Sequence, residues 1–254
     1  MTGLARSLLL VPARNEWATV GTVVQVARRL GYDVCVVDDC SDDATADSAE
    51  AAGAHVVRLP VKLGVGAAVR CGLRWALAQG YDTVVQVRGD GRYDPEQVKA
   101  LLAAMGDTGA DMVIGSRVAD GAGPVRRLAM RLLSARVRRV AGVRVVDASS
   151  EFRAIRRPLL DRLADSYPPE YHTVGALIAA GRMGAKIVEQ PIVTRPDRRG
   201  SGRGVTLWYL MRAIVAFVLF PRRERPLRLL VAAIGQPRST ITGRRGSARS
   251  HGLR

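Results

Sequence analysis

The sequence predicts an α/β domain in which a mostly parallel sheet carries helices on both faces. Short apolar runs alternate with segments of helical spacing through the first half of the chain, the pattern of repeated strand–helix–strand units. Each apolar run is followed by a polar loop, as expected where buried strands end. The 254 residues, 48% hydrophobic and 24% charged, suffice for one such domain with a single core.

Five strands and four helices are expected in the first half. The strands are residues 7–11, 33–37, 55–59, 83–87 and 112–115. The helices are residues 19–30, 43–52, 66–79 and one that opens at Asp94-Pro95-Glu96. One face of the first helix is apolar: Val20, Val23, Val24, Ala27 and Leu30. Asp94 is a candidate N-cap, and Pro95 suits the first helical position.

The second half is less regular. We expect a basic amphipathic helix at 123–140, a short strand at 149–155, helices at 157–163 and 172–180, and a strand at 186–194. A loop rich in Gly and Arg follows at 196–204, so residues 1–204 are predicted to form the α/β domain.

Residues 205–235 are predicted to be amphipathic helices and 236–254 a disordered basic tail. The apolar run 205–220 is interrupted by Arg212 and is shorter than the about 20 residues that a membrane span needs. It is either a helix in the membrane interface, with Trp208 and Tyr209 near the headgroups, or a core or subunit-contact helix. The last segment is rich in Gly, Ser and Arg.

The formal net charge of +16 is concentrated at the C-terminus. From Arg195 onward the chain has 14 Arg and no Lys, against Asp197 and Glu224. Such a segment suits an anionic surface, either a membrane or nucleic acid. Nucleic acid is the less favoured partner, because no aromatic residues are interleaved with the charges of the tail.

The three cysteines, Cys35, Cys40 and Cys71, have no spacing typical of a disulfide framework. We expect free thiols in a reducing compartment. The chain begins close to its first strand without a signal peptide, so we expect a cytoplasmic protein, peripheral on the inner face of the membrane if the C-terminal helices bind lipid.

Charged residues follow four of the expected strands. The loops are Pro12-Ala13-Arg14-Asn15-Glu16, Asp38-Asp39-Cys40-Ser41-Asp42-Asp43, Gly89-Asp90-Gly91 and Gly115-Ser116-Arg117. The carboxyl ends of parallel strands share one edge of the sheet, where ligands of such folds bind. Carboxylates there can hold a ribose or a divalent cation, and arginine can grip a diphosphate. No glycine-rich dinucleotide or Walker motif follows the first strand, which disfavours dehydrogenases and kinases.

This ordered set of motifs resembles the family 2 inverting glycosyltransferases of GT-A fold. Two further segments share the resemblance, Leu-Gly-Val-Gly-Ala-Ala-Val-Arg-Cys-Gly-Leu at 63–73 and Arg-Tyr-Asp-Pro-Glu at 92–96. The similarity spans about residues 7–204 and is strongest to polyprenyl-phosphate mannose and glucose synthases. It implies a sugar-nucleotide donor (a UDP-, GDP- or dTDP-sugar), a Mg²⁺ or Mn²⁺ cofactor, and a lipid-phosphate or small-molecule acceptor.

The resemblance also assigns roles by position. Those implied to bind the nucleotide sugar are Pro12, Arg14, Glu16, Asp38, Asp39, Arg88, Gly89, Asp90, Arg92, Arg117, Arg198 and Arg203. Asp90 would be the metal ligand of the family's Asp-x-Asp, and Asp147 would lie near the acceptor. Glu189-Gln190-Pro191 resembles the family's Glu-x-Pro at the edge of the site. Asp90, Asp147 and Arg117 are the implied catalytic residues.

Three departures from the family pattern stand out. Arg88 replaces the first Asp of Asp-x-Asp, Arg92-Tyr93 replaces Gln-His, and Glu151 stands where the family usually has Gly. Exchanging a carboxylate for a cation should weaken divalent-cation binding. Either Arg88 contacts the diphosphate and partly replaces the metal, or the protein has lost or altered its activity.

The acceptor decides whether the reaction needs a base. A lipid phosphate is already ionised, whereas a hydroxyl needs a base within hydrogen-bond reach, for which Asp147 and Glu151 are the candidates. His172 is expected to be structural. The alternatives to a polyprenyl-phosphate synthase are a soluble transferase acting on a small metabolite and a catalytically silent nucleotide-binding protein.

Overall fold

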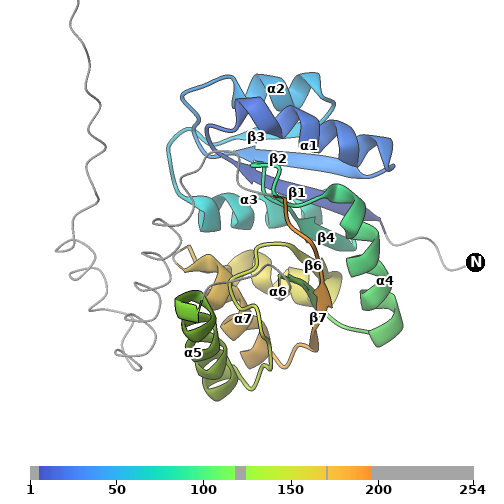
Figure 1. Ribbon diagram of the computed structural model, residues 1–254. Helices are drawn as coiled ribbons and strands as arrows, with labels where there is room; N and C mark the ends of the chain where they lie inside the picture. Colours follow the sequence, from blue (N-terminus) through green and yellow to red (C-terminus); the bar gives the residue numbers. More distant parts are fainter. Residues whose placement is uncertain (1–5, 118–123, 170, 196–254) are drawn as a thin grey trace, which may run out of the picture. The chain divides into compact units, whose positions relative to one another are not determined.

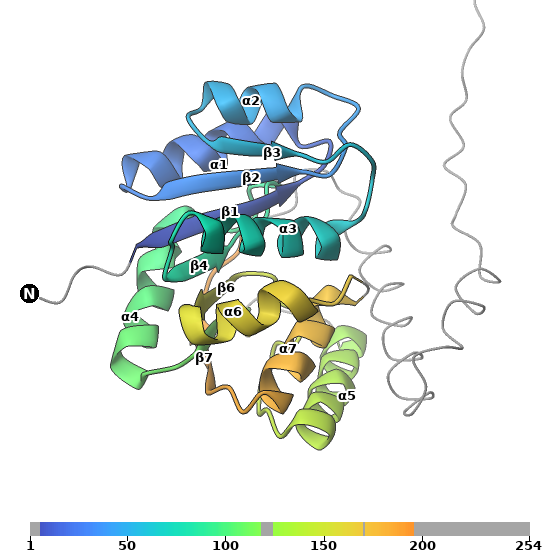
Figure 2. The same cartoon turned by 180° about the vertical axis from the view of Figure 1, so that it is seen from behind.

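The computed structural model describes residues 6–117, 124–169 and 171–195, which form one seven-stranded sheet with helices on both faces (Figures 1 and 2). The strand order is β3-β2-β1-β4-β6-β5-β7. The strands are β1 (Ser7–Ala13), β2 (Asp33–Asp38), β3 (His55–Arg58), β4 (Thr83–Gln86), β5 (Met112–Ser116), β6 (Arg153–Arg156) and β7 (Ile187–Pro191). The expected fold class is confirmed.

The helices are α1 (Trp17–Arg29), α2 (Thr45–Ala51), α3 (Val65–Ala78), α4 (Val98–Thr108), α5 (Pro124–Ala141), α6 (Arg157–Ser166) and α7 (His172–Arg182). A short 3-10 turn, Pro95–Gln97, precedes α4, and the Asp94 side chain caps it by accepting a hydrogen bond from the backbone N–H of Glu96. The helices predicted between residues 19 and 180 are all present, with their ends shifted by a few residues or less.

Alternation along the strands divides the core into two apolar clusters. Leu8 and Leu10 of β1 point to one face of the sheet, where α3, α6 and α7 pack and α5 covers α7. Leu9 and Val11 point to the other face, where α1, α2 and α4 pack. Both faces of β1 are therefore buried, as expected for a central strand of a parallel sheet.

The second half differs from the prediction at two strands. The strand expected at 149–155 begins only at Arg153, and it runs antiparallel to both β4 and β5. Residues 149–152 form a loop instead, since the carbonyl of Ser150 accepts two hydrogen bonds from the Arg153 guanidinium. The last strand ends at Pro191, and beyond it Thr194 makes an isolated antiparallel bridge to Tyr93.

No helix among the described residues is long and apolar enough to cross a membrane. The helices predicted within 205–235, the tail predicted at 236–254, and the predicted donor-site residues Arg198 and Arg203 lie outside the described residues.

Candidate active site

The loops after β1 and β2 are held together by their own polar residues. Asn15 adopts the left-handed conformation (φ 53°), and its Oδ1 accepts a hydrogen bond from the backbone N–H of Asp42 at 2.9 Å. Its backbone N–H donates to Ser41 Oγ at 3.0 Å, and Arg14 pairs with Asp42 at 3.0 Å. The loop carrying Pro12, Arg14 and Glu16 is thus fixed against the loop carrying Asp38 and Asp39.

The two neighbouring aspartates at the end of β2 have different tasks. Asp38 accepts hydrogen bonds from the backbone N–H and the hydroxyl of Ser41. Asp39 accepts from the backbone N–H of Leu63 at 2.7 Å and of Gly64 at 2.9 Å. Gly64 has a φ of 92°, a conformation that side chains rarely adopt, so the turn before α3 depends on this glycine and on Asp39.

The ends of β1 and β4 meet through Glu16 and Gly89. The Thr19 hydroxyl lies 3.2 Å from Glu16 Oε2 and 2.8 Å from the carbonyl oxygen of Gly89. A Cβ at Gly89 would lie only 3.2 Å from the Cβ of Ala13. Position 89 therefore admits glycine best, because a side chain would push the two strand ends apart.

Four side chains form a charged chain, which we call the Arg88 cluster: Arg88, Asp90, Glu151 and His172. Arg88 Nε lies 2.8 Å from Asp90 Oδ2, and Arg88 Nη1 lies 2.9 Å from Glu151 Oε2. His172 Nε2 lies 2.9 Å from Glu151 Oε1. The other oxygen of Asp90, Oδ1, accepts from the backbone N–H of Arg92 at 3.1 Å. All four oxygens of the two carboxylates are thus engaged.

The charges of the Arg88 cluster stabilise one another. Burial opposes the ionisation of Glu151, but the charge of Arg88 and the hydrogen bond with His172 hold its pKa well below the usual range. An ionised carboxylate only accepts hydrogen bonds, so this contact places a proton on Nε2 of His172. The charge of Glu151, more than that of Asp90, raises the pKa of Arg88.

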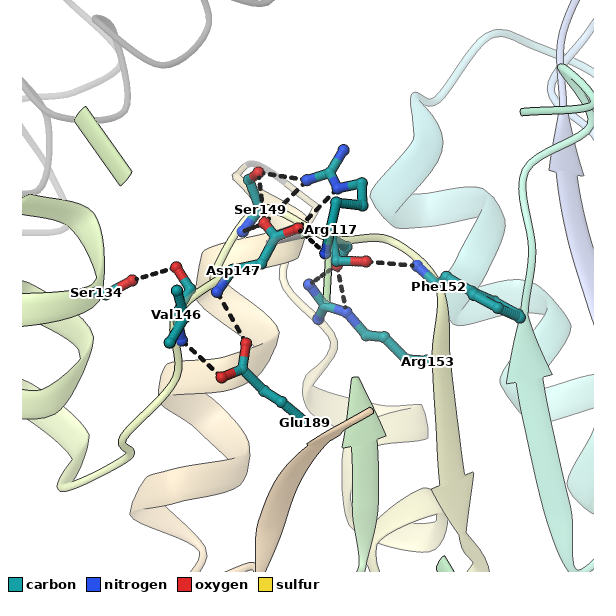
Figure 3. A network of polar contacts seen from close by, with 9 residues as sticks. Arg117, Ser134, Val146, Asp147, Ser149, Phe152, Arg153 and Glu189 are labelled. Carbon is teal, nitrogen blue, oxygen red and sulfur yellow. Dashed lines mark hydrogen bonds and ion pairs between the residues drawn. The ribbon is translucent and has the colours of Figure 1, made fainter. Parts of the chain in front are cut away.

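A second network joins Arg117 after β5 to Asp147 (Figure 3). Arg117 Nε donates to Asp147 Oδ2 at 2.7 Å, and Nη2 donates to Oδ1 at 2.9 Å, which makes a forked ion pair. Nη2 also reaches Ser149 Oγ at 2.7 Å. Burial opposes the ionisation of Asp147, yet the hydrogen bonds and charge of Arg117 lower its pKa.

Glu189 of β7 supports this network from below. Its two carboxylate oxygens accept the backbone N–H groups of Val146 and Asp147, both at 2.8 Å (Figure 3). The hydroxyl of Ser134 in α5 donates to the carbonyl oxygen of Val146 at 3.0 Å. Glu189 and α5 therefore hold the loop that carries Asp147. Glu189, the first residue of the segment that resembles Glu-x-Pro, thus positions this loop.

Tyr93 is a buried side chain on which charges of both networks act. It packs against Phe152, with ring centroids 5.4 Å apart. Burial raises the pKa of its phenol, on which the charges of Arg117, Glu151, Asp147 and Arg88 also act. The charges of Arg88 and Arg117, which follow β4 and β5, thus both act on Tyr93, and the Thr19 hydroxyl links Glu16 to the carbonyl oxygen of Gly89.

Arg92 and Arg195 extend the site along the loop after β7. The backbone N–H of Arg195 donates to the carbonyl oxygen of Arg92 at 2.9 Å, and the Arg195 guanidinium pairs with Asp94 at 2.6 Å. The last described residue, Arg195, is therefore held beside Arg92.

His172 and Ser149 contact predicted residues, Glu151 and Arg117, although sequence reasoning did not select either of them. His172 was expected to be structural, but it contacts Glu151, which lies 21 residues earlier in the chain. No local sequence pattern predicts either contact, because each depends on how the loop at 142–152 folds back toward Arg88 and Arg117.

Comparison with known proteins agrees with this architecture. The profile of the glycosyl transferase family 2 matches residues 9–164. The chain belongs to this family. It is 34% identical over 203 residues to the undecaprenyl-phosphate mannosyltransferase of Micrococcus luteus, covering 74% of this chain and 82% of that protein. It is 33% identical over 171 residues to the polyprenol monophosphomannose synthase of Mycolicibacterium smegmatis, covering 62% of this chain and 64% of that protein.

Solved structures with this fold include a sugar transferase with its nucleotide. Glucosyl-3-phosphoglycerate synthase from Mycobacterium tuberculosis, in complex with Mn²⁺, UDP and glucosyl-3-phosphoglycerate, superimposes with a TM-score of 0.64 at 25% identity. The match covers 86% of this chain and 81% of that one. Together the comparisons identify this chain as a glycosyltransferase of GT-A fold.

The residues of this glycosyltransferase do not fit a divalent cation held as in the family's Asp-x-Asp. Position 88 presents a guanidinium, and both oxygens of Asp90 are engaged by Arg88 and Arg92. Within residues 6–117, 124–169 and 171–195, no group of three or more His, Cys, Asp or Glu side chains could hold a metal ion. Among the described residues, Asp90 therefore has no second carboxylate at position 88 with which to hold a metal ion as the resemblance implies.

Proposed function

We propose that this glycosyltransferase moves a sugar, with inversion, from a nucleotide-diphosphate donor to the phosphate of a polyprenyl phosphate. The donor nucleotide would lie against the ends of β1 and β2, beside Pro12, Arg14, Glu16, Asp38 and Asp39. The sugar diphosphate would extend toward Arg88 and Arg117, whose charges stabilise the leaving diphosphate. This proposal is supported by the pairing of Arg14 with Asp42, by the Thr19 hydroxyl that links Glu16 to Gly89, and by the charges of Arg88 and Arg117, which both act on Tyr93.

One observation carries the choice of acceptor: neither candidate base has the chemistry of a base. An effective general base has a pKa near the working pH. Asp147 is bound in a forked pair to Arg117, Glu151 is bound to Arg88, and both pKa values are lowered. A phosphate acceptor needs no base, because its oxygen is already ionised. The names of the two relatives, an undecaprenyl-phosphate mannosyltransferase and a polyprenol monophosphomannose synthase, point to the same acceptor class.

The exposed surface of α5 supports a lipid acceptor independently. Leu128 and Leu132, one helical turn apart, are 59% and 45% exposed. Arg131, Arg138 and Arg139 are exposed on the same helix, and Pro124–Ala141 contains no acidic residue. Apolar side chains beside arginines suit the surface of an anionic bilayer. Ser134 of α5 is hydrogen-bonded to the loop that carries Asp147. A membrane bound to the exposed face of α5 would therefore bring lipid phosphate close to the site.

A soluble transferase is the second candidate. It is favoured by the structural similarity to glucosyl-3-phosphoglycerate synthase, which was solved with phosphoglyceric acid. That reading keeps the same donor site and leaves the exposed leucines of α5 without a role.

In the experiment, the full chain is incubated with a UDP-, GDP- or dTDP-sugar that carries a label on the sugar. The acceptor is either undecaprenyl phosphate in anionic vesicles or 3-phosphoglycerate. We expect label in the lipid fraction, lost on Arg117→Ala. The control Arg74→Ala should keep full transfer, since Arg74 pairs with Asp165 on the exposed surface of α3 and α6. Label in the phosphoglycerate instead would favour the soluble transferase. Nucleotide binding without transfer to either acceptor would favour a catalytically altered protein.

A further inference from the structure

Two of the residues that depart from the family pattern are each other's partners. Arg88 stands in place of an Asp and Glu151 in place of a Gly, and their side chains meet at 2.9 Å although 63 residues separate them. The cation at position 88 is therefore paired with the anion at position 151. The pair extends on one side to Asp90 and on the other to His172, so position 88 belongs to a connected cluster of charged and polar side chains.

The guanidinium is anchored on two sides. Nε is held by Asp90 and Nη1 by Glu151, while Asp90 is itself fixed by the backbone N–H of Arg92 and Glu151 by His172. Rotating Arg88 away would leave the Glu151 and Asp90 carboxylates, 12% and 13% exposed, without their cation. The plane of the guanidinium is thus set before any ligand arrives.

One nitrogen of Arg88 is available to a ligand. Nη2 has no hydrogen-bond acceptor within the described part of the chain, and the side chain is 41% exposed. An anchored guanidinium with a free N–H edge binds phosphate oxygens directionally. It supplies a fixed positive charge in the loop after β4. The solved glucosyl-3-phosphoglycerate synthase, in contrast, was crystallised with Mn²⁺ and UDP in the same complex.

We propose that Arg88 is a built-in cation that binds the donor diphosphate directly, so that donor binding requires no divalent metal ion. Asp90 and Glu151 are positioning residues that hold the guanidinium, and His172 holds Glu151. This inference rests on the proposed sugar-nucleotide donor, and it assigns to Asp90 a role different from that of a metal ligand.

The test measures the binding of UDP, GDP and dTDP to the full-length protein by calorimetry, in EDTA and in MnCl₂. We expect the preferred nucleotide to bind wild type with the same affinity, within about twofold, in both buffers. Arg88→Ala should weaken binding about tenfold or more in both, as expected for the loss of one charge-assisted hydrogen bond. Arg74→Ala is the matched control, an arginine in an exposed ion pair, and should bind as wild type does.

The sharpest variant is R88D/E151G, which restores the family pattern at both positions. We expect its nucleotide binding to be lost in EDTA and recovered in MnCl₂, a switch that a merely structural role of Glu151 would not produce. Circular dichroism verifies that the variant folds. If it does not fold, the binding of nucleotide to wild type in EDTA and in MnCl₂ still tests whether donor binding needs a metal ion.

Two failures are distinguishable. Wild type that binds nucleotide only with MnCl₂ overturns the built-in cation and leaves the proposed transferase intact. Wild type that binds none of the three nucleotides in either buffer overturns both.

Discussion

Replacing Asp147 with asparagine should destabilise the fold strongly, because it leaves a buried guanidinium without its counter-charge. The side chains of Arg117 and Asp147 are only 10% and 6% exposed, and two hydrogen bonds of 2.7 and 2.9 Å join them. Breaking a buried ion pair by removing one partner costs about 3–5 kcal/mol. The asparagine keeps one acceptor oxygen, so we expect the lower end, about 3 kcal/mol.

Thermal denaturation measures the effect. For a domain of this size, 1 kcal/mol corresponds to about 2–4 °C, so the melting temperature should fall by roughly 6–12 °C. The matched control is Asp165→Asn. Asp165 pairs with Arg74 at 2.8 Å, but the two side chains are 78% and 54% exposed, so its loss should cost less than about 1 kcal/mol. Equal, small shifts for the two variants would refute the reasoning that burial sets the cost.

The pH dependence of the same pair supplies a second test. The pKa of Asp147 is lowered in the folded protein, so the stability it contributes is present above the unfolded pKa, about 3.9, and is lost as the pH falls through the folded value. The difference in melting temperature between wild type and D147N should therefore be full at pH 7 and shrink below about pH 4. A difference that persists unchanged to pH 2 would contradict the assignment.

Three further outcomes are expected. Gly72→Ala should destabilise by about 1–3 kcal/mol in urea denaturation, because the new Cβ would lie 2.1 Å from Leu10 Cδ1; Gly106→Ala in α4, where nothing lies within 4 Å, should not destabilise. Glu151→Gln should lower the melting temperature less than D147N does, since Arg88 keeps Asp90 as a partner and is more exposed than Arg117. Leu128→Gln with Leu132→Gln should weaken sedimentation with anionic vesicles roughly tenfold or more, while nucleotide binding in the same preparation stays unchanged.

The strand-end loops could be located from the sequence because their causes are local. Apolar runs such as residues 33–37 stop at charged residues, and parallel topology then places Asp38, Gly89 and Arg117 at one edge. The N-cap at Asp94 was predictable for the same reason, since capping chemistry involves residues two or three positions apart.

The pairing of side chains across loops could not be predicted in this way. Arg88 and Glu151, or Arg117 and Asp147, meet only because β6 inserts antiparallel between β4 and β5 and brings the preceding loop against both strand ends. A short strand carries no periodicity that reveals its direction. The first residues of the strand expected at 149–155 form a loop. The backbone N–H of Ser149 donates to Asp147 and the carbonyl of Ser150 accepts from Arg153, so these backbone groups bond to side chains instead of to the sheet.

The partnership of Arg88 with Glu151 bears on whether the altered Asp-x-Asp marks a lost activity. Arg88 beside a glycine would keep only Asp90 as a counter-charge, and Glu151 beside an aspartate would add a third carboxylate to a poorly exposed site. Each exchange alone therefore costs stability, and together they satisfy one another. A site that has merely decayed would not need the second charge, whereas a site that still binds an anion gains from a guanidinium held in a fixed plane. The geometry of Arg88 is thus the one we expect of the proposed diphosphate site, which the nucleotide-binding experiment tests.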